Sequence, residues 1–230
     1  MLTVLDLFSG IGGFSLGFER AGMKTVAFCE IDPFCRRVLA KHWPDVPCHE
    51  DITKLRGSDV GPVDVVCGGP PCQPISSASR GRRKALDDDR WLWPEMGRLV
   101  AELDPDWVIL ENTDDLDGLG LDQIASNLEA MGHEVLPLGL QACSVGLDHI
   151  RPRCWVVSNA NRKGKPRRAF NAKVARVHGD AGHPKILGTA DGISGRMDRH
   201  QLRALGNSVP PFIPELIGRA IIDVEKASDA

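Results

Sequence analysis

A cysteine and a glutamate each follow a strongly apolar segment of this chain, and these two residue types together can perform nucleophilic and acid–base chemistry. Cys72 comes after two rigid prolines, and the run Val63–Cys67 before them predicts a buried strand that ends in two glycines. Glu111 follows a second apolar strand, Trp107–Leu110. Because open α/β sheets bind ligands at the carboxyl ends of their strands, we expect the thiol and the carboxyl to form a nucleophile and proton-donor pair.

Glycines and acids at earlier strand ends predict a cofactor site. Three glycines follow the first strand and permit a tight turn close to a ligand, namely Gly10, Gly12 and Gly13. Glu30 and Asp51 stand at the next two strand ends, where carboxylates can bind a ribose diol and an adenine amino group. Ser15 departs from the GxGxxG dinucleotide pattern. We expect an adenosine-bearing cofactor, and these residues leave NAD and S-adenosylmethionine as alternatives.

Strands and helices alternate along the chain. The predicted strands are 2–8, 24–29, a short segment closed by Asp51-Ile52, 63–67, 107–111, 134–142 and 153–158. The first predicted helix ends near Ala21, and the second runs from Pro33 to about Trp43. Three further helices are predicted over 94–103, 120–131 and 212–226. This alternation predicts an α/β fold with a mostly parallel sheet and helices on both faces. The last two strands have no helix between them, which predicts an antiparallel pair at one edge.

The composition limits the class of protein. The 230 residues are 42% hydrophobic, which favours one large α/β domain with a small appendage over two independent domains. No apolar run approaches about eighteen residues, and the chain enters a strand at once, so we expect neither a membrane span nor a signal peptide. Seven cysteines without framework spacing indicate reduced thiols in the cytoplasm. No cysteine or histidine group has zinc-site spacing, so we expect no metal.

The net charge of −3 is unevenly distributed. Residues 159–200 carry three aspartates and ten basic residues, a local net charge of +7 that leaves −10 for the rest of the chain. The basic residues are Arg162, Lys163, Lys165, Arg167, Arg168, Lys173, Arg176, Lys185, Arg196 and Arg199. Such an excess in a segment poor in apolar residues predicts a surface that contacts phosphates. A solvated insertion is the alternative.

In their order, and across nearly the whole chain, these motifs resemble those of the C5-cytosine DNA methyltransferases. The matching segments are Asp6–Gly13, Glu30 with Asp51, Gly69–Gln73, Glu111-Asn112, the two arginines Arg151 and Arg153, and Gly206–Pro211. The resemblance implies a Rossmann-like, S-adenosylmethionine-dependent methyltransferase fold. Departures are Thr113 after Glu-Asn, His149 in place of the usual glutamine, and Pro74-Ile75-Ser76 after the nucleophile motif. No clear copy of the family's ninth motif is present, and the segment that normally holds the target-recognition domain is short.

The resemblance implies a covalent mechanism on cytosine. The Cys72 thiolate attacks C6, which makes C5 nucleophilic toward the methyl group of S-adenosylmethionine. Glu111 acts at N3, while Arg153, with Arg151 behind it, holds O2. Loss of the C5 proton with β-elimination frees the enzyme. Because the ring atoms are buried in duplex DNA, the cytosine must flip out of the helix.

The residue patterns and the resemblance together give two sets of binding residues. The cofactor-binding set is Phe8, Gly10, Ile11, Gly12, Gly13, Glu30, Ile31, Asp51, Ile52, Pro70, Asn207, Ser208 and Val209. The DNA-binding set is Gln73, Ser76, Arg80, Arg82, Arg83 and Lys84, together with Arg162, Lys163, Lys165, Arg167, Arg168 and Lys173. In the second set, the run from Arg80 to Lys84 could clamp phosphates as the loop after the nucleophile closes.

We therefore expect three parts: a catalytic domain over 1–158, a reduced DNA-recognition segment over 159–200, and a closing motif and helix over 201–230 that packs back on the catalytic domain. Double-stranded DNA is the expected partner of a monomer, in the cytoplasm of a bacterial or phage-infected cell. The small recognition segment indicates either a short target site or a second protein that supplies specificity. The compact size is more typical of a solitary phage enzyme than of half of a restriction–modification pair.

Three other functions stay open. The same chemistry could act on RNA, because Cys72 and Glu111 cannot report the sugar. A non-catalytic relative that binds S-adenosylmethionine or DNA is a second alternative, although such a protein has no physical need for the complete set of reactive residues. A nicotinamide oxidoreductase is the weakest alternative, since nothing in its chemistry requires Pro70-Pro71-Cys72.

Overall fold

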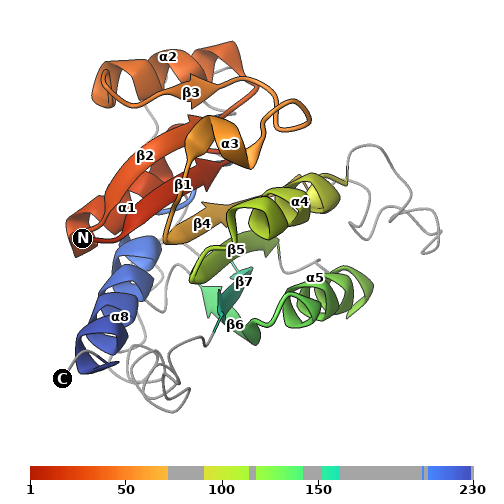
Figure 1. The fold of residues 1–230 in the computed structure, drawn as a ribbon. Helices are drawn as coiled ribbons and strands as arrows, with labels where there is room; N and C mark the ends of the chain where they lie inside the picture. The colour runs from red at the N-terminus through yellow and green to blue at the C-terminus, as the bar shows by residue number, and fades with distance from the viewer. Residues whose placement is uncertain (72–90, 114–117, 142–151, 161–203, 205–206, 229–230) are drawn as a thin grey trace, which may run out of the picture.

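The computed structural model describes residues 1–71, 91–113, 118–141, 152–160, 204 and 207–228, and these form a sheet with helices on both faces (Figure 1). The strands are β1 (Thr3–Leu7), β2 (Lys24–Cys29), β3 (Cys48–His49), β4 (Val65–Gly68), β5 (Trp107–Thr113), β6 (Glu134–Gln141) and β7 (Pro152–Asn159). The helices are α1 (Gly13–Ala21), α2 (Pro33–His42), α3 (Gly57–Val60), α4 (Trp93–Leu103), α5 (Gly118–Ala130) and α8 (Phe212–Ser228).

The order of the strands reverses at the centre of the sheet, between β1 and β4. The order is β3-β2-β1-β4-β5-β7-β6. The first five strands in this order run parallel, whereas β7 pairs antiparallel with both β5 and β6. The chain moves outward from β1 to β3 and then returns to β4 on the other side of β1. At such a reversal, open α/β sheets bind their ligands beyond the carboxyl ends of the two central strands. The α/β fold and the antiparallel edge pair are confirmed.

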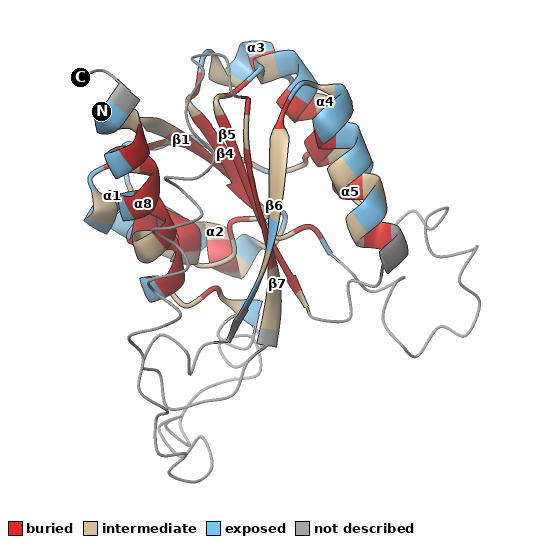
Figure 2. Ribbon diagram, turned by 90° about the horizontal axis from the view of Figure 1, so that it is seen from below, coloured by how far each residue is buried: buried red, intermediate tan, exposed pale blue. Residues whose placement is uncertain are grey.

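Two apolar layers cover the sheet. Helices α1 and α8 lie on one face and α4 and α5 on the other (Figure 2). The alternation of side chains along β1 supplies both layers, because Val4 belongs to the cluster under α1 and α8, whereas Leu5 and Leu7 belong to the cluster under α4 and α5. Close packing of α1 with the segment before α8 depends on Gly17, since a Cβ there would lie 2.3 Å from the carbonyl oxygen of Pro211.

Two local predictions are wrong. The third strand ends at His49 rather than at Asp51-Ile52. Asp51 instead begins a turn, because its Oδ1 accepts hydrogen bonds from the backbone N–H and the hydroxyl of Thr53. The short helix α3 was not predicted, since its four residues carry no apolar periodicity. No helix in the described part of the chain is long and apolar enough to span a membrane.

Candidate active site

The loop after β1 has a backbone shape that brings main-chain groups to the sheet edge. Phe8, Gly10 and Gly12 adopt positive φ angles of 54°, 53° and 88°. Glycine adopts such angles readily, whereas residues with a Cβ, such as Phe8, rarely do. A Cβ on Gly10 would meet no atom within 4 Å. The loop thus leaves open space beside its own backbone, which is the condition for a ligand to approach it closely.

The Glu30 carboxylate is fixed beside this loop. It directly follows β2, and its Oε2 accepts a hydrogen bond of 2.7 Å from the Gly10 N–H, while Oε1 accepts one of 2.8 Å from the Asp32 N–H. Each carboxylate oxygen can accept more than one hydrogen bond, so both remain able to bind hydroxyl groups. The neighbouring Ile31 is 74% exposed. A positioned carboxylate next to an exposed aliphatic side chain fits the ribose and base of an adenosine group.

Asp51 and Ile52 form the adjoining corner of the edge. The hydrogen bonds from Thr53 lower the pKa of the Asp51 carboxyl, and Lys54 lies 3.2 Å from its Oδ2. Ile52 is only 5% exposed and packs in the core, and its carbonyl oxygen accepts a hydrogen bond from Arg98. Asp51 is therefore an ionised hydrogen-bond acceptor on a turn that the buried Ile52 anchors in the core.

The segment before α8 returns to the first loop. A Cβ on Gly13 would lie 2.2 Å from the carbonyl oxygen of Val209, so the two backbones are in direct contact. Asn207 is exposed and Ser208 is half-buried in the same segment. The fold thus brings residues from both ends of the sequence together beside the loop after β1.

Glu111 and Arg153 form an ion pair at the carboxyl end of β5. Arg153 Nε lies 2.7 Å from Glu111 Oε1, and both side chains are largely buried. The pair is diagonal across the β5–β7 ladder, because Arg153 is directly opposite Thr113, which stands two residues after Glu111 on the same face. The close, largely buried ion pair restricts the orientation of the carboxylate.

A side-chain hydrogen bond connects this strand to the nucleophile segment. Asn112 is 5% exposed, and its Nδ2 donates to the carbonyl oxygen of Pro70 over 3.1 Å. Gly69 packs directly over Glu111, since a Cβ there would lie 3.4 Å from Glu111 Oε2. The sheet therefore brings together the Pro70-Pro71 step and the Glu111 carboxylate, as the two strand ends predict.

Other thiols and acids near the edge are buried. Burial raises the pKa of Cys29 to about 12 and that of Cys67 well above its usual range. Burial also raises the pKa of Asp6 to about 7, against the opposing effect of hydrogen bonds from Ser15. Asp6 Oδ2 accepts from the Ser15 hydroxyl over 2.7 Å. Burial thus disfavours the charged forms of these groups, which lie in the interior of the fold rather than facing a ligand.

Several predicted site residues lie outside the described residues. They are Cys72, Gln73, Ser76, Arg80, Arg82, Arg83, Lys84, Arg151, Arg162, Lys163, Lys165, Arg167, Arg168 and Lys173. Their assignments stay predictions.

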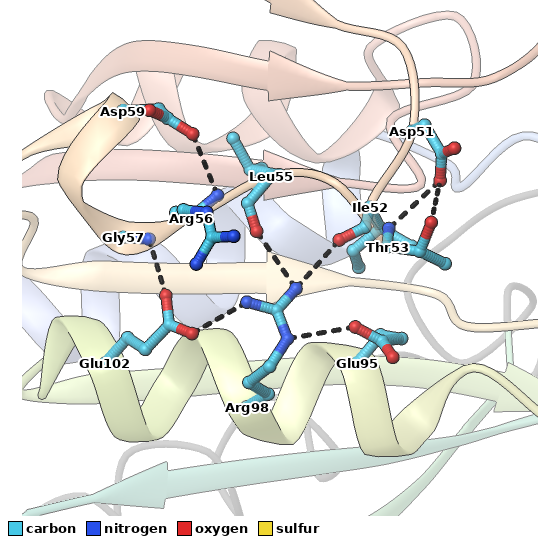
Figure 3. Close-up of polar contacts among 10 residues, drawn as sticks. All are labelled: Asp51, Ile52, Thr53, Leu55, Arg56, Gly57, Asp59, Glu95, Arg98 and Glu102. Carbon is cyan, nitrogen blue, oxygen red and sulfur yellow. Dashed lines mark hydrogen bonds and ion pairs between the residues drawn. The ribbon is translucent and has the colours of Figure 1, made fainter.

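Sequence reasoning missed Arg98, which connects α4 to the turn that carries Asp51 (Figure 3). The spacing of Glu95, Arg98 and Glu102 predicts ion pairs along one helix face. It contains no signal for the hydrogen bonds that Arg98 also donates to the carbonyl oxygens of Ile52 and Leu55.

Comparisons with known proteins match the chain to one family. The model of the C-5 cytosine-specific DNA methylase family matches residues 2–185. Type II methyltransferase M1.HphI of Haemophilus parahaemolyticus is 36% identical over 164 residues, 66% of this chain and 44% of that protein. Type II methyltransferase M.NgoMIV of Neisseria gonorrhoeae is 34% identical over 164 residues, 69% of this chain and 52% of that protein.

A solved structure agrees with these relatives. A candidate DNA modification methyltransferase encoded within a prophage of E. coli superposes with a TM-score of 0.62 and 26% identity, and the match covers 82% of this chain and 52% of that one. The chain thus spans about half the length of the curated relatives it matches. The family model, the relatives and the fold lead to one conclusion: the chain belongs to the C-5 cytosine-specific DNA methylase family.

Proposed function

We propose that this chain transfers a methyl group from S-adenosylmethionine to C5 of a cytosine flipped out of double-stranded DNA. One observation carries the proposal: the Asn112–Pro70 hydrogen bond holds the Pro70-Pro71 step, which leads to Cys72, at the Glu111 carboxylate that Arg153 orients. Cys72 is the next residue in the sequence after this step. A nucleophile and an acid at neighbouring strand ends are what addition to a cytosine ring requires.

The protein groups divide the work on the base. Addition of the Cys72 thiolate at C6 moves electron density to C5, and elimination after loss of the C5 proton restores both the ring and the thiolate. Glu111 would stabilise the charge that develops at N3 of the cytosine as the ring is attacked. Arg153 would bind O2 of the cytosine and also keep the Glu111 carboxylate in place. Arg151 would assist Arg153.

The residues at the carboxyl ends of β1, β2 and β3 fit the cofactor. S-adenosylmethionine, when bound, supplies the electrophilic methyl group. Glu30 would hold the ribose hydroxyls, Asp51 would accept from the adenine amino group, and Ile31 would cover the adenine face. The remaining predicted residues of this site, in the loops over 8–13 and 207–209 and at Ile52 and Pro70, would line the rest of the cofactor.

Glu30 gives a direct check of the cofactor site. Glu30→Ala removes the carboxylate that would bind the ribose and that receives the Gly10 and Asp32 N–H groups, so we expect S-adenosylmethionine to bind at least about tenfold more weakly by calorimetry. Cys72→Ala, at a different strand end, should bind as the parent does. Glu50→Ala removes an exposed carboxylate of the same charge and is the matched control. Equal affinity for Glu30→Ala and the parent would overturn the cofactor assignment.

Methyl transfer itself tests the function. The purified chain is incubated with labelled S-adenosylmethionine and duplex DNA, and bisulfite sequencing then locates any 5-methylcytosine. Methylation of DNA at a defined short site is the expected result, and a partner would be required if the chain alone modifies no site. In a parallel incubation with RNA, transfer of label to RNA but not to DNA would show that the chain is an RNA methyltransferase instead. Cofactor and DNA binding without transfer, with and without cell extract, would indicate a non-catalytic relative. We also propose that the protein acts in the cytoplasm of a bacterial or phage-infected cell, where DNA is directly accessible to it.

A further inference from the structure

Arg98 makes contacts in two directions from the middle of α4 (Figure 3). Along its own helix, Nε lies 2.9 Å from Glu95 Oε2 and Nη1 lies 2.7 Å from Glu102 Oε1. Across to the turn after β3, Nη2 donates to the carbonyl oxygens of Ile52 and Leu55, both at 2.9 Å. A single guanidinium therefore joins two carboxylates of a helix to two carbonyl groups of a loop.

The turn that receives these bonds is also stabilised by its own backbone hydrogen bonds and by two buried side chains. The N–H groups of Lys54 and Leu55 both donate to the Asp51 carbonyl oxygen, which closes one helical turn. The side chains of Ile52 and Leu55 are 5% and 2% exposed and anchor the turn in the core. The carbonyl groups at the end of such a turn carry partial negative charge and are favourably bound by a cation. Arg98 supplies that cation.

The same contacts extend to the next element. Glu102 uses its second oxygen, Oε2, to accept a hydrogen bond of 2.7 Å from the Gly57 N–H at the start of α3. This bond and the Arg98 ion pair lower the pKa of Glu102, so the carboxylate stays ionised. The chain from Asp51 to Gly57 is thus attached to α4 at three backbone groups.

We propose that Arg98 is a positioning residue for cofactor recognition: by fixing the Asp51–Leu55 turn to α4, it holds the Asp51 carboxylate where it selects the adenine amino group. The inference rests on the proposed function, because Asp51 meets adenine only if the cofactor binds at this edge. Arg98 itself does not touch the cofactor. Its effect passes through a turn whose geometry decides the direction of one acceptor.

Neither lysine nor glutamine can replace Arg98 fully. Arginine has five N–H donors in a rigid plane, enough for both glutamates and both carbonyl groups at once. A lysine ammonium keeps the charge and can pair with the glutamates, but it is a compact point donor on a flexible chain. A glutamine loses both the charge and most of the donors. The variants therefore separate charge from geometry.

The test measures base selectivity rather than stability. Calorimetry compares S-adenosylhomocysteine with its inosine analogue, whose 6-oxo group cannot donate to Asp51. We expect the parent to prefer the adenine compound by about tenfold, the value of one well-placed charged hydrogen bond. In Arg98→Lys and Arg98→Gln, binding of the adenine compound should weaken until the preference falls to about twofold or less, with little change for the inosine analogue. The KM for S-adenosylmethionine should rise, whereas kcat at saturating cofactor should stay near the parent value.

Two controls isolate the role of the turn. Arg219→Gln removes another arginine that pairs with a glutamate four residues earlier, Glu215 on α8, and should leave the base preference unchanged. In an Asp51→Asn background the preference should already be lost, and Arg98→Lys should reduce it no further, as expected if both residues act through one contact.

Each result has one meaning for the proposal. A parent-like preference and KM in Arg98→Lys, and in Arg98→Gln where that variant folds, would overturn the positioning role while leaving the cofactor site intact. Failure of the parent to bind S-adenosylhomocysteine, or to distinguish the two bases, would overturn the assignment of Asp51 and of the cofactor edge, and the inference with it.

Discussion

Arg153 and Glu111 form a largely buried ion pair at the carboxyl end of β5. The guanidinium occupies one carboxylate oxygen, Oε1, and an arginine bound in this way restricts the rotation of the carboxyl group. Gly69 allows the backbone of the neighbouring strand end to lie against the same carboxyl, near Oε2. Orientation by a fixed cation on one side and a residue without a side chain on the other leaves a defined direction for contact with a base.

Asp6 shows that residue chemistry near the edge can serve the fold alone. Its carboxyl is fully buried, next to Ser15 on α1 and opposite Cys67 on β4. Burial of an acid without a cation favours the protonated form, which is why the pKa of Asp6 rises from 3.8 to about 7. The first acid of the glycine motif is therefore a core group and a sensor of pH for stability.

The Asp6 shift predicts a pH dependence of stability. Between its unfolded value of 3.8 and its folded value of about 7, Asp6 keeps a proton in the fold that the unfolded chain releases, so the free energy of unfolding falls as pH rises. Relative to Asp6→Asn, the parent should lose up to ~1.4 kcal/mol per pH unit from pH 5 toward pH 7 and then level off. Urea unfolding of both proteins at pH 5, 6, 7 and 8 measures this difference, and two parallel curves would contradict it.

At the scale of elements, the sequence predicted the strands and helices that carry periodic apolar residues. The runs 107–110 and 63–67 led correctly to β5 and β4, and with them to the placement of Glu111 beside the Pro70-Pro71 step. The Asp51 turn could not be predicted in the same way, because it depends on where a carboxylate finds donors rather than on periodicity. Arg98 reads as a helix-surface residue until the fold brings the turn against it.

Glycine explains why two helices pack closely while another glycine has no such role. Gly17 lies on α1 with the Pro211 carbonyl oxygen 2.3 Å from the site of a Cβ, whereas the corresponding position at Gly97 on α4 has only ordinary contacts with Trp93 at 3.7 Å. The first glycine is required for contact between elements. The second carries only the intrinsic cost of glycine in a helix.

Alanine substitution at these two glycines should act in opposite directions. Gly17→Ala forces α1 away from the segment before α8, and we expect the free energy of unfolding to fall by ~1–3 kcal/mol. Gly97→Ala should raise it by ~0.5–1 kcal/mol, since the helix gains propensity without a clash. Thermal and urea unfolding of both variants give the comparison. If Gly17→Ala is as stable as the parent protein, α1 and the Pro211 segment do not pack as described.

At the scale of the whole molecule, the acidic and basic parts of the chain are separate. The segment 159–200 carries +7 and the rest carries −10, so attraction to a polyanion would be concentrated in that segment. The described residues that we propose for cofactor binding and catalysis lie at the carboxyl edge of the sheet. We expect the charged segment to supply affinity for DNA and the edge to supply chemistry.

Salt dependence tests this division of labour. Neutralising Arg167, Arg168 and Lys173 should lower the slope of log binding constant against log salt for nonspecific duplex DNA by ~2–3, at ~0.9 per phosphate contact. Neutralising three exposed basic residues of the described sheet and helices should change it little; they are Arg20, Lys24 and Lys41. Equal slopes for the parent and the first variant would identify the segment as a solvated insertion.

In the proposed mechanism, Cys72 attacks C6 of a cytosine held at Glu111, and covalent trapping on DNA that carries 5-fluorocytosine tests this step. Fluorine cannot leave as a cation, so elimination fails after methyl transfer and the enzyme stays bound. We expect a covalent adduct that requires S-adenosylmethionine, survives denaturing electrophoresis, is absent in Cys72→Ser and forms much more slowly in Glu111→Gln. An equal adduct with Cys72→Ser, or no adduct with a parent protein that binds both ligands, would contradict the account.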